Sequence, residues 1–107
     1  MKRGDLVTIA LQGDFGKPRP ALVIQSDLFA AHPSVTVLTV TGELRNAPLF
    51  RIQVEPDDRN GLQKTSEIMV DKAQTVPRAR IGEPFGQVTE EQMLAVNRSL
   101  AVFLGVV

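Results

Sequence analysis

The sequence predicts a mainly β fold of the α+β class, in which mostly antiparallel strands are followed by one C-terminal helix. Short runs rich in β-branched and aliphatic residues recur along the chain, and turn-forming residues separate them, which is typical of strands. Apolar residues at helical spacing appear convincingly in the C-terminal segment. A length of 107 residues suits one hydrophobic core, so we expect a single domain over residues 1–107.

The strands expected in the N-terminal half are residues 5–11, 21–25 and 35–41. The second is a short apolar run between turn signals, as in a strand that is buried on both faces. The third is the clearest strand of the chain, and Gly42 ends it. Between them, residues 26–31 fit one helical turn with Ser26 as its N-cap.

The strands expected in the C-terminal half are residues 50–54, 67–71 and 74–76. The first alternates apolar and polar residues, which marks a half-solvated strand. A helix then follows Thr89, because Thr89 and Gln92 have the spacing of a capping box, and Gly105 ends it. Its apolar stripe fits core packing and consists of Met93, Val96, Leu100, Phe103 and Leu104.

The composition excludes several kinds of site. Without Cys the chain has no disulfide framework, thiolate zinc site or cysteine nucleophile, and one His cannot form a pair of imidazoles. The 12 basic and 12 acidic residues cancel, so a phosphate site must be a local cluster. No metal site is expected, and the Asp57-Asp58 pair fits a solvated turn. With no secretory signal and no bilayer-length apolar run, we expect a cytoplasmic protein without membrane contact.

Arg19 is the most informative candidate site residue. It stands between Pro18 and Pro20, which restrain the backbone, and its guanidinium matches two phosphate oxygens. Lys17 would add a second positive charge nearby. Thr41 is the last residue of a predicted strand, where a side chain can face a cleft. On local features alone, ordinary solvated loop charges are the better interpretation of Arg19 and Lys17, and Thr41 fits an ordinary strand threonine.

The order of several segments resembles the MazF/PemK (Kid) family of toxins from type II toxin–antitoxin pairs. The chain begins with an RGDLV stretch at residues 3–7 and continues with RPALVIQSD at residues 19–27. The stretch GLQKTSEIMVD at residues 61–71 and QTV at residues 74–76 follow in the family's order, as does the terminal helix. The resemblance covers essentially the whole chain, and the RPALVIQSD stretch is its most specific part.

The resemblance implies an SH3-like barrel of the CcdB/MazF type with a C-terminal helix. It implies a homodimer that cuts single-stranded RNA (mRNA) without a metal or cofactor, and an antitoxin whose flexible tail covers the RNA groove. The family's catalytic Arg and Thr fall on Arg19 and Thr41. The residues expected to bind substrate are Phe15, Gly16, Lys17, Lys64, Thr65, Ser66 and Gln74.

The chain departs from the family pattern in the short loop between Gln12 and Lys17 and at Gln74, where the family often has Arg. Phe15 is the only aromatic residue of that loop, and it could stack on a base or pack on the barrel. Two alternatives stay open. One is a gyrase poison of the CcdB type, although the C-terminal end lacks Trp, and the other is a non-catalytic SH3-like binding module.

Overall fold

The computed structural model describes residues 1–10 and 17–107. The predictions that concern Phe15 and Gly16 lie outside the described residues. The strands are β1 (Asp5–Ala10), β2 (Pro18–Val23), β3 (Ser34–Thr41), β4 (Arg51–Val54), β5 (Ser66–Pro77) and β6 (Gly86–Gln87). The helical segments are the 3₁₀ turns η1 (Asp27–Phe29) and η2 (Arg78–Arg80) and the helix α1 (Glu90–Leu104).

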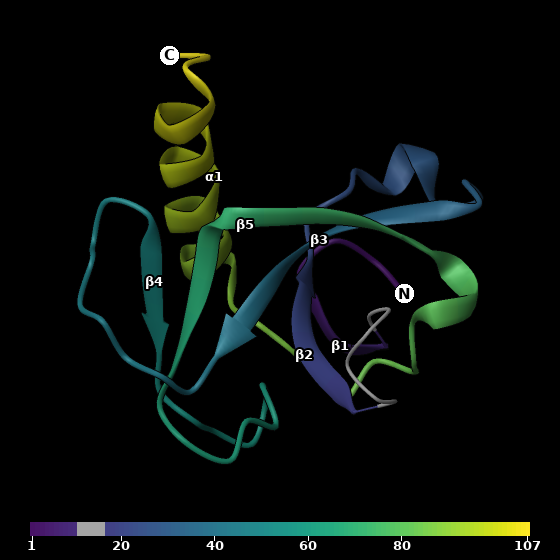
Figure 1. The fold of residues 1–107 in the computed structure, drawn as a ribbon, viewed down its shortest axis with the longest axis horizontal. Helices are drawn as coiled ribbons and strands as arrows, with labels where there is room; N and C mark the ends of the chain where they lie inside the picture. Colours follow the sequence, from purple (N-terminus) through teal and green to yellow (C-terminus); the bar gives the residue numbers. More distant parts are fainter. Residues whose placement is uncertain (11–16) are drawn as a thin grey trace.

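The strands form one antiparallel sheet in the order β4-β5-β3-β2-β1-β6. The sheet curls into a half-barrel, and α1 stands against it beside β4 and β5 (Figure 1). The predicted fold class, mainly β with a C-terminal helix, is therefore confirmed. Within the described residues, no helix has the length and apolar character needed to cross a membrane.

Both faces of the central strands are buried, which explains the continuous apolar runs in the sequence. Along β3, Leu38 and Val40 face one core cluster, whereas Val35 and Val37 face another. The first cluster packs against α1 through Val96, which is fully buried. Side chains that alternate across the pleat can bury both faces here because the sheet curls.

The two predicted strands 67–71 and 74–76 are the two arms of β5, a single strand of 12 residues. Opposite the step from Leu38 to Val40 on β3, the partner on β5 changes from Ala73 to Ile68, so β5 carries extra residues there. Extra residues bend a strand locally. Figure 1 shows the corner, from which one arm runs beside β4 and the other toward η2.

The helix begins as predicted. Thr89 Oγ1 accepts a hydrogen bond from the Gln92 N–H at 3.0 Å, and the Thr89 N–H donates to Gln92 Oε1 at 2.8 Å. Gly105 ends the helix in the left-handed conformation, with φ of 72°. The predicted core stripe is only partly correct, because Phe103 and Leu104 are 51% and 62% exposed. The last turns of α1 extend beyond the sheet that covers its first turns (Figure 1).

Candidate active site

The strands β2 and β3 separate at one end, and proline chemistry explains why. The N–H of Ile24 donates to the carbonyl of Thr36, and the register continues through Leu22 opposite Leu38. Hydrogen-bonded pairs recur at every second residue, so the pair after Leu22 and Leu38 would have the N–H of residue 20 donate to the carbonyl of Val40. Residue 20 is proline and has no N–H, so β2–β3 pairing stops at Ala21.

The separation affects only one side of β2. Arg19 keeps its place opposite Ile9 in the pairing of β2 with β1. On the other side, β3 turns to β5, where Thr41 is paired with Glu67. An unfinished end of the β2–β3 ladder therefore lies between Arg19 and Thr41.

An open cleft of about 670 Å³ occupies this end of the sheet. Four of the predicted site residues line it: Arg19, Thr41, Lys64 and Ser66. Other parts of its wall are formed by Thr8, Pro20, Leu62 and Phe85. Residues that are far apart in the sequence thus form a surface with cations, hydroxyls and an apolar wall, which suits a phosphate with an attached organic group.

Thr41 is half-buried at the end of β3. Its Oγ1 accepts a hydrogen bond from the Glu43 N–H at 3.1 Å. A hydroxyl that accepts one bond still has its own proton to donate. Thr41 can therefore donate to an oxygen in the cleft while the backbone of the following turn fixes its position.

Lys64 lies across Gly42, directly beside Thr41. A Cβ atom added at Gly42 would collide with Lys64 Cε and lie 2.7 Å from Nζ. Only glycine at position 42 leaves room for the Lys64 side chain in its present conformation. The ammonium group is thereby brought to the cleft that also contains Arg19.

The loop after Thr41 is held by a buried carboxylate. Glu67, which is 2% exposed, accepts hydrogen bonds from the Arg45 and Asn46 N–H groups at 3.0 and 3.2 Å. Arg51 Nη1 donates to the same carboxylate at 2.8 Å and to the Glu43 carbonyl at 3.0 Å. The hydrogen bond from Arg51, followed by that from the Arg45 N–H, holds the pKa of Glu67 below its ordinary value.

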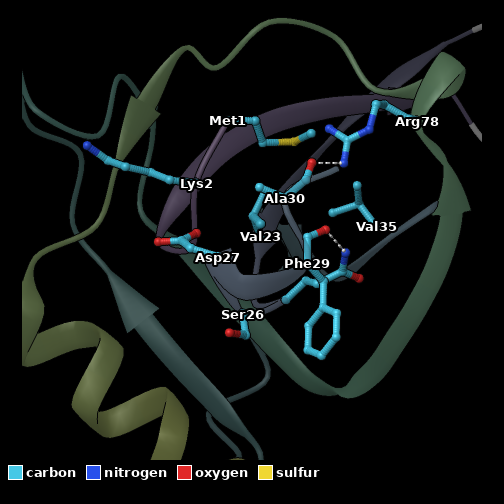
Figure 2. A pocket seen from close by; sticks show the side chains of 10 residues that line it. Met1, Lys2, Val23, Ser26, Asp27, Phe29, Ala30, Val35 and Arg78 are labelled. Carbon is cyan, nitrogen blue, oxygen red and sulfur yellow. Dashed lines mark hydrogen bonds between the residues drawn. The ribbon is translucent and has the colours of Figure 1, made fainter. Parts of the chain in front are cut away.

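A second hollow, on another part of the surface, holds only about 10 Å³ (Figure 2). Its walls include Arg78, whose guanidinium donates to the carbonyls of Ala30 and His32. These bonds tie η1 and the turn after it to the end of β5. The hollow is too small for a nucleotide, and the Arg78 guanidinium in its wall stabilises the turn by hydrogen bonds to backbone carbonyls.

The sequence matches, over residues 2–104, the family described as the PemK-like, MazF-like toxin of type II toxin–antitoxin system. The chain belongs to this family. It is 46% identical, over 99% of its length and 98% of the relative's, to the probable endoribonuclease MazF of Mycolicibacterium smegmatis. It is 29% identical to the endoribonuclease MazF of Staphylococcus saprophyticus, over 98% of this chain and 92% of the relative.

The fold is also that of solved MazF-type toxins. A mycobacterial endoribonuclease in complex with its cognate antitoxin has a TM-score of 0.83 at 23% identity, over 100% of this chain and 97% of that one. The Mycobacterium tuberculosis toxin MazF-mt6 has a TM-score of 0.80 at 24% identity, covering 94% and 96% of the chains. The predicted family is confirmed, and by family the chain is a toxin of the MazF endoribonuclease class.

Three predicted substrate-binding residues of this MazF-type toxin do not line the cleft. Lys17 is exposed just before β2, and Thr65 donates its hydroxyl to Glu55 Oε2 at 2.7 Å. Gln74 lies on the second arm of β5, opposite Val37. Their part in binding stays a prediction. Within residues 1–10 and 17–107, no cluster of three or more His, Cys, Asp or Glu could hold a metal ion.

Sequence reasoning missed Phe85, which forms part of the cleft wall. It stands between Pro84 and Gly86 in a segment without apolar periodicity, so no local pattern marks it as a site residue. Its only sequence signal is an aromatic side chain among turn-forming residues. The fold brings it to the cleft because the adjoining β6 pairs with the start of β1.

Proposed function

We propose that this toxin cleaves single-stranded RNA by attack of a ribose 2′-hydroxyl on the adjacent phosphate, without a metal ion. The observation that carries the proposal is the cleft that Arg19, Lys64 and Thr41 share. In this reaction the RNA supplies its own nucleophile. The protein has to align that nucleophile with phosphorus and stabilise the charge that develops.

The reaction exchanges one P–O bond for another. The bond from the 2′-oxygen to phosphorus forms and the bond to the 5′-oxygen breaks, which leaves a 2′,3′-cyclic phosphate and a 5′-hydroxyl. The 2′-hydroxyl loses a proton and the departing 5′-oxygen gains one, so protons balance. DNA lacks the nucleophile and should resist cleavage.

Arg19 would stabilise the phosphorane through its fixed charge and its several N–H donors. Lys64 would neutralise a neighbouring phosphoryl oxygen as a compact charge. Thr41 would donate a hydrogen bond from its hydroxyl to a third oxygen and so orient the phosphoryl group. Fixed donors in a cleft act on developing charge without the reorganisation that water would need.

The test is cleavage of a long single-stranded RNA in EDTA by the wild type and Arg19→Ala. We expect cuts at a recurrent short motif and a rate that is lower by at least about 10²-fold in the variant, as when one oxyanion donor is removed. Arg80→Ala is the matched control, because Arg80 is an exposed arginine that does not line the cleft. A loss of tenfold or less in Arg19→Ala contradicts the assigned role.

The same assay separates the two alternatives. A gyrase poison of the CcdB type or a non-catalytic SH3-like module would leave the RNA intact in EDTA although the protein is folded. Cleavage that the control keeps and Arg19→Ala loses belongs to the nuclease alone. Analysis of the products for a cyclic phosphate tests the 2′-hydroxyl route separately.

We also propose that the toxin is a cytoplasmic homodimer that a flexible antitoxin tail inhibits by covering the cleft. The exposed apolar end of α1, with Val102 at 60% exposure beside Phe103 and Leu104, supports a protein contact there. The solved mycobacterial relative in complex with its cognate antitoxin supports an antitoxin partner. Sedimentation of the wild type and Phe103→Asp tests the homodimer contact at the end of α1. The same measurement with added antitoxin tests the antitoxin contact.

A further inference from the structure

Phe85 is the one aromatic side chain among the described residues that line the candidate active-site cleft. It is 38% exposed, whereas Val88, shortly after it, is 5% exposed and belongs to the core cluster under α1. A phenylalanine used only for core packing would bury its ring, since an exposed ring forfeits the free energy of burial. Part of Phe85 therefore remains available to a ligand in the cleft.

The position of Phe85 is fixed from both sides. Its N–H donates to the carbonyl of Leu6 at 2.9 Å. Gly61, in the left-handed region with φ of 67°, leaves just enough room, because a Cβ there would lie 2.8 Å from the Phe85 carbonyl oxygen and 3.3 Å from Cδ1. A Cβ at Gly86 would collide with the backbone carbonyl of Asn60. The backbone of β1 at Leu6 and the loop at residues 60 and 61 therefore hold Phe85 and its neighbour Gly86 from two sides.

The loop behind Phe85 is itself locked by Asn60, which is 1% exposed. Asn60 Oδ1 accepts hydrogen bonds from the Asp57 and Leu62 N–H groups, both at 3.0 Å, and Nδ2 donates to the Glu55 carbonyl at 2.8 Å. Three hydrogen bonds of the side-chain amide are therefore made within the loop. A locked support means that little freedom is lost when a flat ligand stacks on the phenyl ring.

We propose that Phe85 is a stacking platform for a nucleobase next to the phosphate held by Arg19 and Lys64. The proposal rests on the proposed function, because the ligand it assigns is the RNA strand in that cleft. Unpaired RNA bases bind proteins by stacking on aromatic side chains, and every base has a face for this. Leu62 extends the apolar wall beside the ring. Phe85 thus positions substrate, while the phosphate contacts carry the chemistry.

The test uses an RNA with 2-aminopurine at each position flanking the cleavage site in turn and a 2′-deoxy nucleotide at that site to prevent cleavage. Stacking quenches 2-aminopurine fluorescence. We expect quenching at one position with the wild type and with Phe85→Tyr, and its loss with Phe85→Leu. Binding of the RNA should weaken about tenfold or more in Phe85→Leu, as for the loss of one base–aromatic stack.

Phe29→Leu is the matched control, because Phe29 is a 57% exposed phenylalanine that lines the small hollow of Figure 2 instead of the cleft. It should bind and quench like the wild type. Thermal melting checks that Phe85→Leu is folded, and Phe85→Tyr, which keeps the ring, supplies a second folded comparison. On cleavable RNA, Phe85→Leu should raise KM more than it lowers kcat.

Equal quenching and equal affinity in the wild type and Phe85→Leu would overturn the platform. So would a tenfold loss in Phe85→Leu that Phe29→Leu reproduces. Failure of the nuclease proposal looks different: the wild type would then leave cleavable RNA intact in EDTA, whatever the binding experiment gives. The two inferences therefore fail in separate measurements.

Discussion

Arg19 and Thr41 occupy the two positions that would face each other if the β2–β3 ladder continued past Ala21 and Thr39. The ladder ends because the next donor position is Pro20. Two side chains at neighbouring strand positions are thereby left at the edge of a cleft instead of within a closed sheet. Pro20, which restrains the backbone of the preceding Arg19, therefore also keeps the site open.

Replacing this proline should close the site. Pro20→Val supplies an N–H that can donate to Val40, so we expect the β2–β3 ladder to extend and RNA cleavage to slow by at least about tenfold, since small misplacements of reacting groups are costly. The fold should be retained. Hydrogen exchange of the new amide and the cleavage rate are the two measurements. Pro48→Val, in an exposed loop, is the control, and a protected new amide with an unchanged rate would contradict the argument.

Glu67 and Arg51 predict an acid-sensitive fold. Because the folded-state pKa of Glu67 lies below its ordinary value of 4.5, mainly through the Arg51 hydrogen bond, its stabilising contribution is present above pH 4.5. It is lost as the pH falls through the folded-state pKa. Glu67→Gln should therefore lower Tm at pH 7, where the carboxylate is charged, and should reduce the further loss of Tm in acid.

Thermal melts between about pH 7 and about pH 3, a range that includes the ordinary pKa of a glutamate, measure this difference. Glu83→Gln is the control, because Glu83 is exposed and takes no part in the loop after Thr41. Parallel Tm curves for the wild type and Glu67→Gln would show that the carboxylate does not hold the loop through its charge. A steeper acid loss in Glu67→Gln would contradict the sign of the linkage.

The cap of α1 predicts a loss of stability without a loss of chemistry. Thr89→Ala removes the acceptor for the Gln92 N–H, so the free energy of unfolding should fall by about 1 kcal/mol. Urea unfolding measures it, and Thr89→Ser, which keeps the acceptor, should restore most of it. The cleavage rate of the folded protein should not change, because Thr89 does not line the cleft. A rate loss in Thr89→Ala would mean that α1 acts on the site.

Local patterns predicted the features that depend on local chemistry. The capping residue Thr89, the strand that ends at Thr41 and the β-branched runs all follow from propensity and hydrogen bonding within a few residues. The corner of β5 did not, because it depends on extra residues relative to β3, which lie far away in the sequence. Sequence alone read the corner as a gap between two strands.

The candidate site divides in the same way. Arg19 and Thr41 could be predicted as candidates because the prolines and the strand end mark them locally and a family resemblance implies roles for them. The structure places both at the cleft, and their catalytic roles stay a prediction. Phe85 could not be predicted, since it enters the cleft through the pairing of the short β6 with β1 and through close backbone contacts with Gly61. A strand of two residues carries too little periodicity to predict.

Lys64 predicts a change in the salt dependence of RNA binding. If its ammonium neutralises one phosphate, Lys64→Met should lower the slope of log Kd against log salt by about 0.7, the value for one contact with a single strand. Methionine keeps an unbranched apolar chain to lie over Gly42, so the loss is mainly one of charge. Binding of the uncleavable RNA at several salt concentrations gives the slope. Lys72→Met, an exposed lysine outside the cleft, should leave the slope unchanged, and an equal drop in both variants would indicate only the general charge of the protein.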